Sequence, residues 1–248
     1  MGAIASVPFT GGHTHMSHCA SLAPAAFRVI EGLCVHSAHR GQQLAGCLIA
    51  LADAETSRTG PVVHLWWREL PVAPWMLSTA LCAHVYAYLD CVHAQKRLHV
   101  SPCALQDVRI RPHTAEGPHI ISYTPNNRCG RLQAWTIAGG IAGDAAAAAT
   151  VVVVDTRRKP RGGDPSRSIF EVVWCSPHTT AAALETVGAM LGSKAILFAS
   201  SASYQGGATA AWTAPWHYGT AGVHAWYIYN YIPPAFGDCD IYGLREEL

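Results

Sequence analysis

Backbone N–H groups at one strand-to-helix junction near the N-terminus could bind a phosphate. The strand-forming run Leu33-Cys34-Val35 is followed by turn residues, and a helical pattern begins at Gln42. The N–H groups of such a loop and of a helix N-terminus lack partners within the helix, so they favour anions. The predicted cofactor-binding residues at this junction are Leu33, Cys34, Val35, Arg40, Gly41, Gln42, Gln43, Leu44 and Ala45. An ordinary strand-to-helix turn is the alternative, because short loop patterns match by chance.

A second set of residues could perform nucleophilic catalysis. Cys129 is followed by His224 and then by Asp238 or Asp240, an order that resembles transglutaminase-like cysteine enzymes. A thiolate beside an imidazolium that a carboxylate orients suits acyl transfer. The gap between Cys129 and His224 is long for that family, and nine cysteines and fourteen histidines produce such orders by chance. We keep Cys129, His224 and Asp240 as the catalytic residues of an alternative function, that of a transglutaminase-like cysteine enzyme.

A third set could bind a metal ion. His13, His15, His18 and Cys19 carry nitrogen and sulfur atoms that suit zinc. Glycines and polar residues surround them, which favours a flexible loop instead. We predict no metal site.

Two blocks of secondary structure must position these residues. In the first block we expect a strand over 25–35, a helix over 42–54 and a long helix over 75–92. The second block, from about residue 130, is expected to hold strands over 145–155, 168–175, 194–198 and 223–231 and a helix over 178–191. Each block therefore combines strands with a helix, which indicates an α/β protein.

Composition limits the class of protein. Of 248 residues, 50% are hydrophobic and 13% charged, the balance of a globular chain and not of a disordered one. A net charge of +1 argues against nucleic acid as the main partner. The nine cysteines show no C-x-x-C spacing, and no signal peptide or stretch for a transmembrane helix is found, so we expect a cytoplasmic protein. We also expect a monomer.

An ordered series of motifs resembles the N-myristoyltransferase family of GNAT-like acyl-CoA N-acyltransferases. Residues 30–36 (IEGLCVH), with Arg40 and the Leu-Ala pair at 44–45 after them, resemble its signature strand and loop. Residues 2–8 (GAIASVP) resemble an earlier strand of that family. Near the C-terminus, the residues 218–219 (YG), 222–231 (GVHAWYIYNY) and 243–244 (GL) follow in the family's order.

The resemblance implies a GNAT-like mixed sheet flanked by helices, arranged as two pseudo-related lobes. Residues 1–128 would form the acyl-CoA-binding half, truncated at its N-terminus, and residues 129–248 the peptide-binding half. The implied reaction transfers a myristoyl group from acyl-CoA, as co-substrate, to the N-terminal glycine of a polypeptide, with no tightly bound cofactor. A homologue that binds acyl-CoA or peptide without turnover is the alternative.

The resemblance also assigns catalytic roles. The amides of Gly32 and Leu33 would bind the oxyanion that forms when an amine attacks the thioester carbonyl. The C-terminal carboxylate of Leu248 would accept the proton of the amine. The peptide would contact Gly222, Trp226, Tyr227, Tyr229 and Asn230.

Overall fold

A computed structural model gives the fold of the chain. It describes residues 2–8, 13–15, 26–59, 62–69, 78–110, 119–127, 130–160, 162–200, 222–229 and 240–245. No helix within these ranges is long and apolar enough to cross a membrane.

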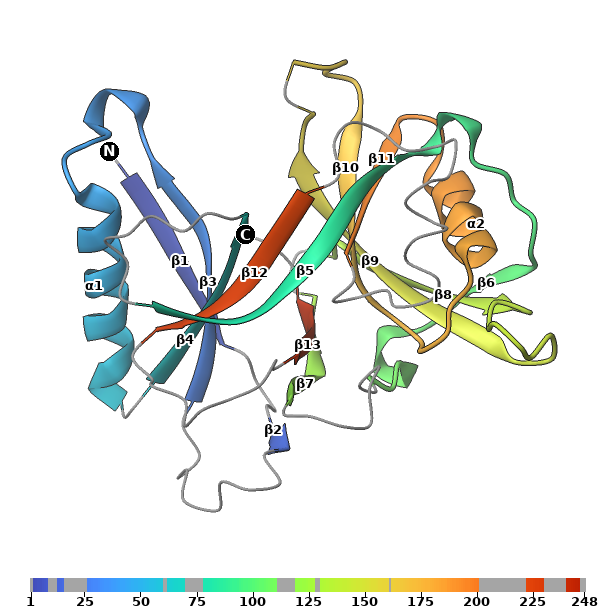
Figure 1. Cartoon of the computed structure of the whole chain (residues 1–248), viewed down its shortest axis with the longest axis horizontal. Helices are drawn as coiled ribbons and strands as arrows, with labels where there is room; N and C mark the ends of the chain where they lie inside the picture. Colours follow the sequence, from blue (N-terminus) through green and yellow to red (C-terminus); the bar gives the residue numbers. More distant parts are fainter. Residues whose placement is uncertain are drawn as a thin grey trace.

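A ten-stranded mixed sheet runs through the whole molecule and carries one helix near each end (Figure 1). Its strands lie in the order β1 (Gly2–Pro8), β3 (Ala26–Val35), β4 (Val62–Glu69), β12 (Gly222–Tyr229), β5 (Ser78–Asp90), β11 (Ala195–Ser200), β10 (Ser168–Cys175), β9 (Ala148–Arg158), β8 (Leu132–Ala138) and β6 (Val100–Pro102). A smaller sheet contains β13 (Asp240–Arg245), β7 (His119–Asn126) and β2 (His13–His15). Helix α1 (Leu44–Thr56) contacts β1, β3 and β4, whereas α2 (Ala181–Leu191) contacts β9 and β11. The predicted α/β class, a mixed sheet flanked by helices, is confirmed.

The same supersecondary unit occurs twice. In each unit an antiparallel pair leads into a helix, and the next strand returns parallel to the second strand of the pair. The first unit is β1, β3, α1 and β4, and the second is β9, β10, α2 and β11. The parallel contact covers four residue pairs in both units, 26–29 with 62–65 and 168–171 with 195–198. The two units are pseudo-related, although the sequence shows no repeat of identities.

Two strands connect the units. β5 pairs with β12 from Ser78 to Tyr86 and with β11 from Tyr86 to Asp90, so it continues the sheet from the first unit into the second. β12 comes from the C-terminal part of the chain but lies between β4 and β5. Strands from before and after residue 128 therefore interleave in one sheet, and the division at 128/129 stays a prediction.

One long element differs from the sequence-based prediction. Residues 75–92 were expected to form a helix, but Ser78–Asp90 is the thirteen-residue strand β5. A central strand is apolar along its length, and periodicity cannot separate such a run from a buried helix. The short strand β2 also corrects the expectation of a flexible loop at His13–His15, because its backbone pairs with β7.

Helix α2 closes the main hydrophobic core over the second unit. Its N-cap is Thr180, whose hydroxyl accepts a hydrogen bond from the Ala183 N–H, and it ends before Gly192 at a φ of +91°. Leu184 and Val187 on its inner face are fully buried against Ile137, β9 and β11. A second cluster, which includes Ile110 and Trp174, covers the opposite face of β8, β9 and β10. The second unit is therefore buried on both faces of its sheet.

Candidate functional site

The first strand-to-helix junction has the geometry that the sequence predicts. β3 ends at Val35, one 3-10 turn follows at Ser37–His39, and α1 begins at Leu44. The chain turns through two residues of left-handed backbone, Gly41 at a φ of +82° and Gln43 at +58°. Gly41 adopts this conformation without strain, whereas Gln43 has a side chain at a positive φ that glycine usually occupies. The predicted strand, loop and helix are confirmed here.

The N-terminus of α1 presents uncapped donors. Gln43 is the N-cap residue, and its side chain makes no capping hydrogen bond. The backbone bond from the Cys47 N–H to the Gln43 carbonyl oxygen, at 3.2 Å, closes the first helical turn. Within the described part of the chain, the N–H groups of Leu44, Ala45 and Gly46 find no acceptor, and the first turn holds no acidic residue. The positive end of the helix dipole is therefore left for an external anion.

Side chains of the loop add to these donors. The Nε of Arg40 donates to the Val35 carbonyl oxygen at 3.5 Å, a long contact that ties the exposed guanidinium to the end of β3. The Nδ1 of His36 accepts a hydrogen bond from the Ala38 N–H at 3.3 Å, and the rings of His36 and His39 lie 6.0 Å apart. Both histidines are exposed beside Arg40. The sequence-based site did not include them, although their spacing from Arg40 could have indicated a shared turn.

A bulge interrupts the strand just before the junction. The register pairs Ala3 with Cys34 and Ala5 with Glu31, so Gly32 and Leu33 together oppose the single residue Ile4. β3 also pairs with β4 only as far as Val29, so no ladder with β4 covers these residues. A bulge takes backbone groups out of the ladder, and bulges are common beside active sites. The irregularity falls on the two residues whose amides were predicted to bind an oxyanion.

The equivalent junction of the second unit is closed by the chain itself. There the Ser176 N–H donates to the Thr150 carbonyl oxygen at 2.8 Å, and the Thr180 N–H donates to the Gly140 carbonyl oxygen at 2.8 Å. The Ala142 N–H donates to the His178 carbonyl oxygen at 2.8 Å, and the Thr180 hydroxyl caps α2. Of the two junctions that lead into an α-helix among the described residues, the first is therefore the open one. We refer to residues 36–46 as the open junction.

Four of the five predicted peptide-binding residues fall on one strand. Gly222, Trp226, Tyr227 and Tyr229 lie on β12, which is separated from β3 by β4 alone. Asn230 and Leu248 lie outside the described residues.

The alternative sites are not assembled in the described part of the chain. His224 lies on β12 in the large sheet and Asp240 on β13 in the small one, while Cys129 lies outside the described residues. No group of three or more histidine, cysteine, aspartate or glutamate side chains gathers for a metal ion among the residues that the structure describes. His18 and Cys19 of the proposed metal set are outside them.

Two other thiols are unsuited to nucleophilic chemistry. Burial raises the pKa of Cys91 to about 12 and that of Cys175 to about 12. Only the thiolate is a nucleophile, and at neutral pH these groups are thiols.

Comparisons with known proteins identify the fold. No protein-family model and no curated protein matches the sequence. Among solved structures, Saccharomyces cerevisiae N-myristoyltransferase with bound myristoyl-CoA is similar at a TM-score of 0.61 and 10% identity, over 94% of this chain and 67% of that one. A further structure of that yeast enzyme with bound myristoyl-CoA has a TM-score of 0.58 and 10% identity, over 94% and 64% of the two chains. A GCN5-related N-acetyltransferase from Kribbella flavida is similar at a TM-score of 0.40 and 12% identity, over 82% and 52%.

The chain has an N-myristoyltransferase-like fold, as its motifs predicted. It spans about two thirds of the length of the yeast enzyme that it matches.

Proposed function

We propose that the protein is an acyl-CoA-dependent N-acyltransferase that transfers a myristoyl group to the N-terminal glycine of a polypeptide. The observation that carries the proposal is the open junction, which leaves helix N–H groups free on a fold whose solved relatives hold myristoyl-CoA. The closed junction of the second unit supports a single acyl-CoA site in the first unit.

The open junction would hold the pyrophosphate of acyl-CoA. The amides of Gly41 through Ala45 and the guanidinium of Arg40 supply donors at the helix N-terminus. Gln42 and Gln43 contribute neutral donors where the related family has basic residues. Leu33, Cys34 and Val35 would lie along the pantetheine arm, because they lead out of the strand into the loop.

The bulge would stabilise the transition state. When the glycine amine attacks the thioester carbon, a C–N bond forms and the carbonyl oxygen becomes an oxyanion, which the Gly32 and Leu33 amides can bind. The intermediate then breaks its C–S bond, and the CoA sulfur leaves as a thiolate. The amine proton passes to a base and the thiolate takes up a proton. No covalent enzyme intermediate is needed.

The remaining assignments belong to the same proposal. Residues 1–128 would contribute the acyl-CoA-binding half and 129–248 the peptide-binding half. The Leu248 carboxylate would act as the base. The peptide would contact Gly222, Trp226, Tyr227, Tyr229 and Asn230.

A transfer assay tests the proposal. The full chain is incubated with myristoyl-CoA and a peptide that begins with glycine, and mass spectrometry follows the acylated peptide. We expect product from the wild type and from Cys129→Ala, and none when a C-terminal extension moves the Leu248 carboxylate away. Loss of turnover in folded Cys129→Ala favours the cysteine enzyme instead. Binding of acyl-CoA without any product identifies a non-catalytic homologue.

A further inference from the structure

The turn between β9 and β10 concentrates positive charge. We call residues 156–168 the basic hairpin. Five of the seventeen lysines and arginines of the chain lie between positions 157 and 167, with a single carboxylate, Asp164. The whole chain has a net charge of only +1, so the rest of it is net negative. The proposed reaction makes no use of this segment.

The basic hairpin projects from the body of the molecule. Figure 1 shows it in yellow and gold, extending beyond the upper edge of the sheet. Arg157, Arg158 and Lys159 are exposed there, and Arg161 lies outside the described residues. Arg157 has a φ of +57°, and its N–H donates to the Asp155 carboxylate at 2.8 Å, so the chain turns at these cations. The Lys159 ammonium donates to the Ser168 hydroxyl at 3.0 Å across the hairpin.

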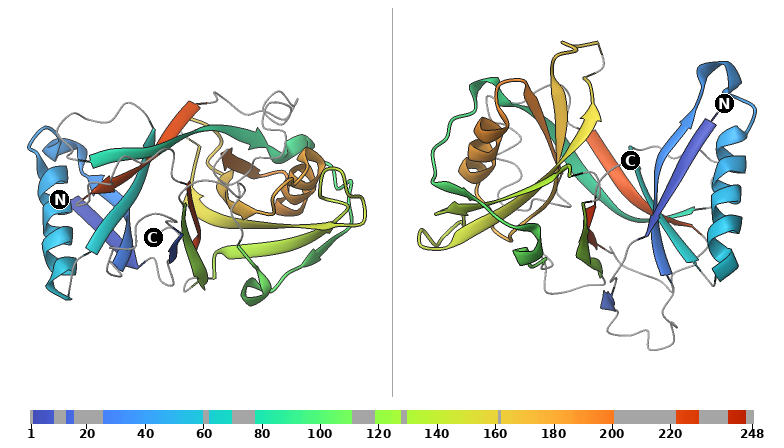
Figure 2. Two further views of the ribbon diagram at one scale, coloured as in Figure 1. Left: turned by 60° about the horizontal axis from the view of Figure 1, so that its bottom comes forward. Right: turned by 180° about the vertical axis from the view of Figure 1, so that it is seen from behind.

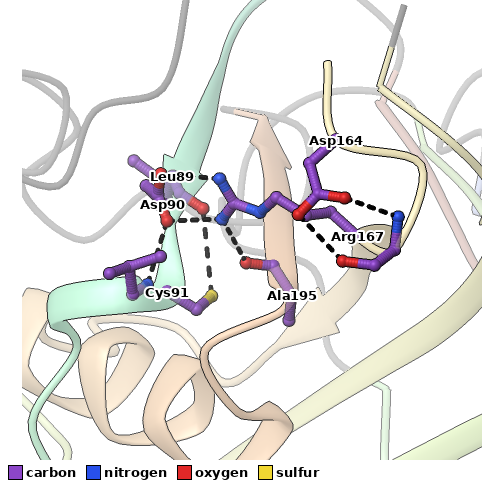
Figure 3. Close-up of polar contacts among 8 residues, drawn as sticks. Leu89, Asp90, Cys91, Asp164, Arg167 and Ala195 are labelled. Atoms are coloured by element: carbon purple, nitrogen blue, oxygen red, sulfur yellow. Dashed lines mark hydrogen bonds and ion pairs between the residues drawn. The ribbon is translucent and has the colours of Figure 1, made fainter.

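The base of the hairpin is clamped to the sheet. Figure 3 shows that Arg167 donates to both carboxylate oxygens of Asp90, at 2.9 and 2.5 Å, and to the Ala195 carbonyl oxygen at 3.1 Å. The carboxylate of Asp164 accepts hydrogen bonds from the N–H and the hydroxyl of Ser166, both at 2.8 Å. Arg167 is therefore paired inside the protein, at the base of the hairpin whose Arg157, Arg158 and Lys159 are exposed.

We propose that the basic hairpin docks on the surface of an anionic lipid bilayer. Clustered lysines and arginines gain binding energy at such a surface from headgroup charge alone, without insertion. Residues 156–168 contain no aromatic side chain, and the two prolines are their only apolar side chains. Docking is therefore peripheral and electrostatic.

RNA fits this surface less well. Single-stranded RNA is bound on aromatic side chains that stack with bases, and the hairpin carries none. Duplex backbones need an extended basic tract, whereas the remainder of this chain is net negative. A compact group of cations on one projecting turn matches a flat anionic surface better.

The basic hairpin lies on the same side of the molecule as the open junction. The open junction after β3 and the basic hairpin lie at the same upper edge, both in Figure 1 and in the view from behind in Figure 2. A bilayer in contact with the hairpin would lie on the side of the open junction. The docking proposal does not depend on the proposed acyl transfer.

Vesicle binding tests the proposal. The full chain is sedimented with vesicles of phosphatidylcholine containing about a third phosphatidylserine, and with vesicles of phosphatidylcholine alone. We expect binding only to the anionic vesicles, weakened by added salt. The variant Arg157→Gln/Arg158→Gln/Lys159→Gln should bind about 100-fold more weakly, since each cation contributes about fivefold.

A matched control removes the same charge elsewhere. Arg58, Lys96 and Arg109 are exposed outside the hairpin, and their triple change to glutamine should leave vesicle binding within about threefold of the wild type. Circular dichroism verifies that both variants are folded. Equal losses in the two variants, or no binding by the wild type, overturn the proposal. Hairpin-dependent binding of a mixed-sequence RNA without vesicle binding also overturns it, in favour of RNA.

Discussion

Replacing Asp90 with asparagine removes the charge that faces Arg167 where β5, β11 and the basic hairpin meet. The two side chains are only 22% and 12% exposed, and their contact is bidentate. Removing one partner of a buried ion pair costs about 3–5 kcal/mol, because the other charge stays buried without compensation. Asp90 and Arg167 are half-buried, and Arg167 keeps its hydrogen bond to the Ala195 carbonyl oxygen, so the expected loss lies between those of exposed and buried pairs, at about 2 kcal/mol.

The pH dependence of this loss has a definite sign. The hydrogen bond from Arg167 holds the pKa of Asp90 below its ordinary value. A carboxyl with a lowered pKa in the folded state stabilises the fold fully above its unfolded pKa of about 3.9, and this stabilisation disappears as the pH falls through the folded pKa. The difference between wild type and Asp90→Asn should therefore be constant from about pH 5 upward and should shrink below about pH 4.

Urea unfolding measures both effects. The free energy of unfolding is compared between the wild type, Asp90→Asn and a control, Glu55→Gln, whose partner Arg58 is 71% exposed. The control should change stability by less than about 1 kcal/mol, since exposed pairs contribute little. The double variant Asp90→Asn/Arg167→Met should recover part of the loss, because it leaves no buried charge. A loss in Asp90→Asn no larger than in the control refutes this reasoning.

Three further predictions concern the two junctions and the thiols. Gln43→Val should lower the free energy of unfolding in urea by about 1–2 kcal/mol, because a β-branched residue resists a positive φ. Gln43→Gly should change it by less than about 1 kcal/mol. Equal effects of the two changes would contradict the left-handed turn. Thr180→Ala should lower the free energy of unfolding by about 1 kcal/mol, because α2 loses its N-terminal cap. CoA affinity, measured by calorimetry, should not change. Weaker CoA binding by this variant would place a ligand at the second junction. Native protein is treated with iodoacetamide at about pH 8 and analysed by peptide mapping. Cys34 should be labelled, whereas Cys91 and Cys175 should not, because burial keeps these two as thiols. Labelling of all three cysteines would contradict this prediction.

Local patterns in the sequence were enough to predict the first junction. Turn residues after Val35 and the leucines of α1 fix a strand, a loop and a helix from neighbouring positions alone. The second junction was equally visible as a strand followed by a helix. The two junctions differ because the Gly140 carbonyl oxygen, which comes from a distant segment, accepts a hydrogen bond from the Thr180 N–H and closes the second junction. No local pattern contains that contact.

Register and strand order could not be predicted for the same reason. The bulge at Gly32 and Leu33 exists only relative to Ile4 on another strand. The local pattern predicts a helix where β5 lies, because the place of β5 between β12 and β11 is decided by pairing over long sequence distances. The clamp between Asp90 and Arg167 joins residues 77 positions apart, so their charges carried no signal in the sequence.

Calorimetric titration of CoA into the full chain tests the central claim, that the open junction binds the pyrophosphate of acyl-CoA. We expect binding by the wild type and a dissociation constant raised about 10- to 150-fold in Arg40→Ala, the range for loss of a charged hydrogen bond. Arg58→Ala, a change of the same type at an exposed position on the far end of α1, should bind as the wild type does. Pantetheine, which lacks the pyrophosphate, should compete only at much higher concentration than CoA. Absence of CoA binding, or equal affinity in Arg40→Ala and the wild type, contradicts the account.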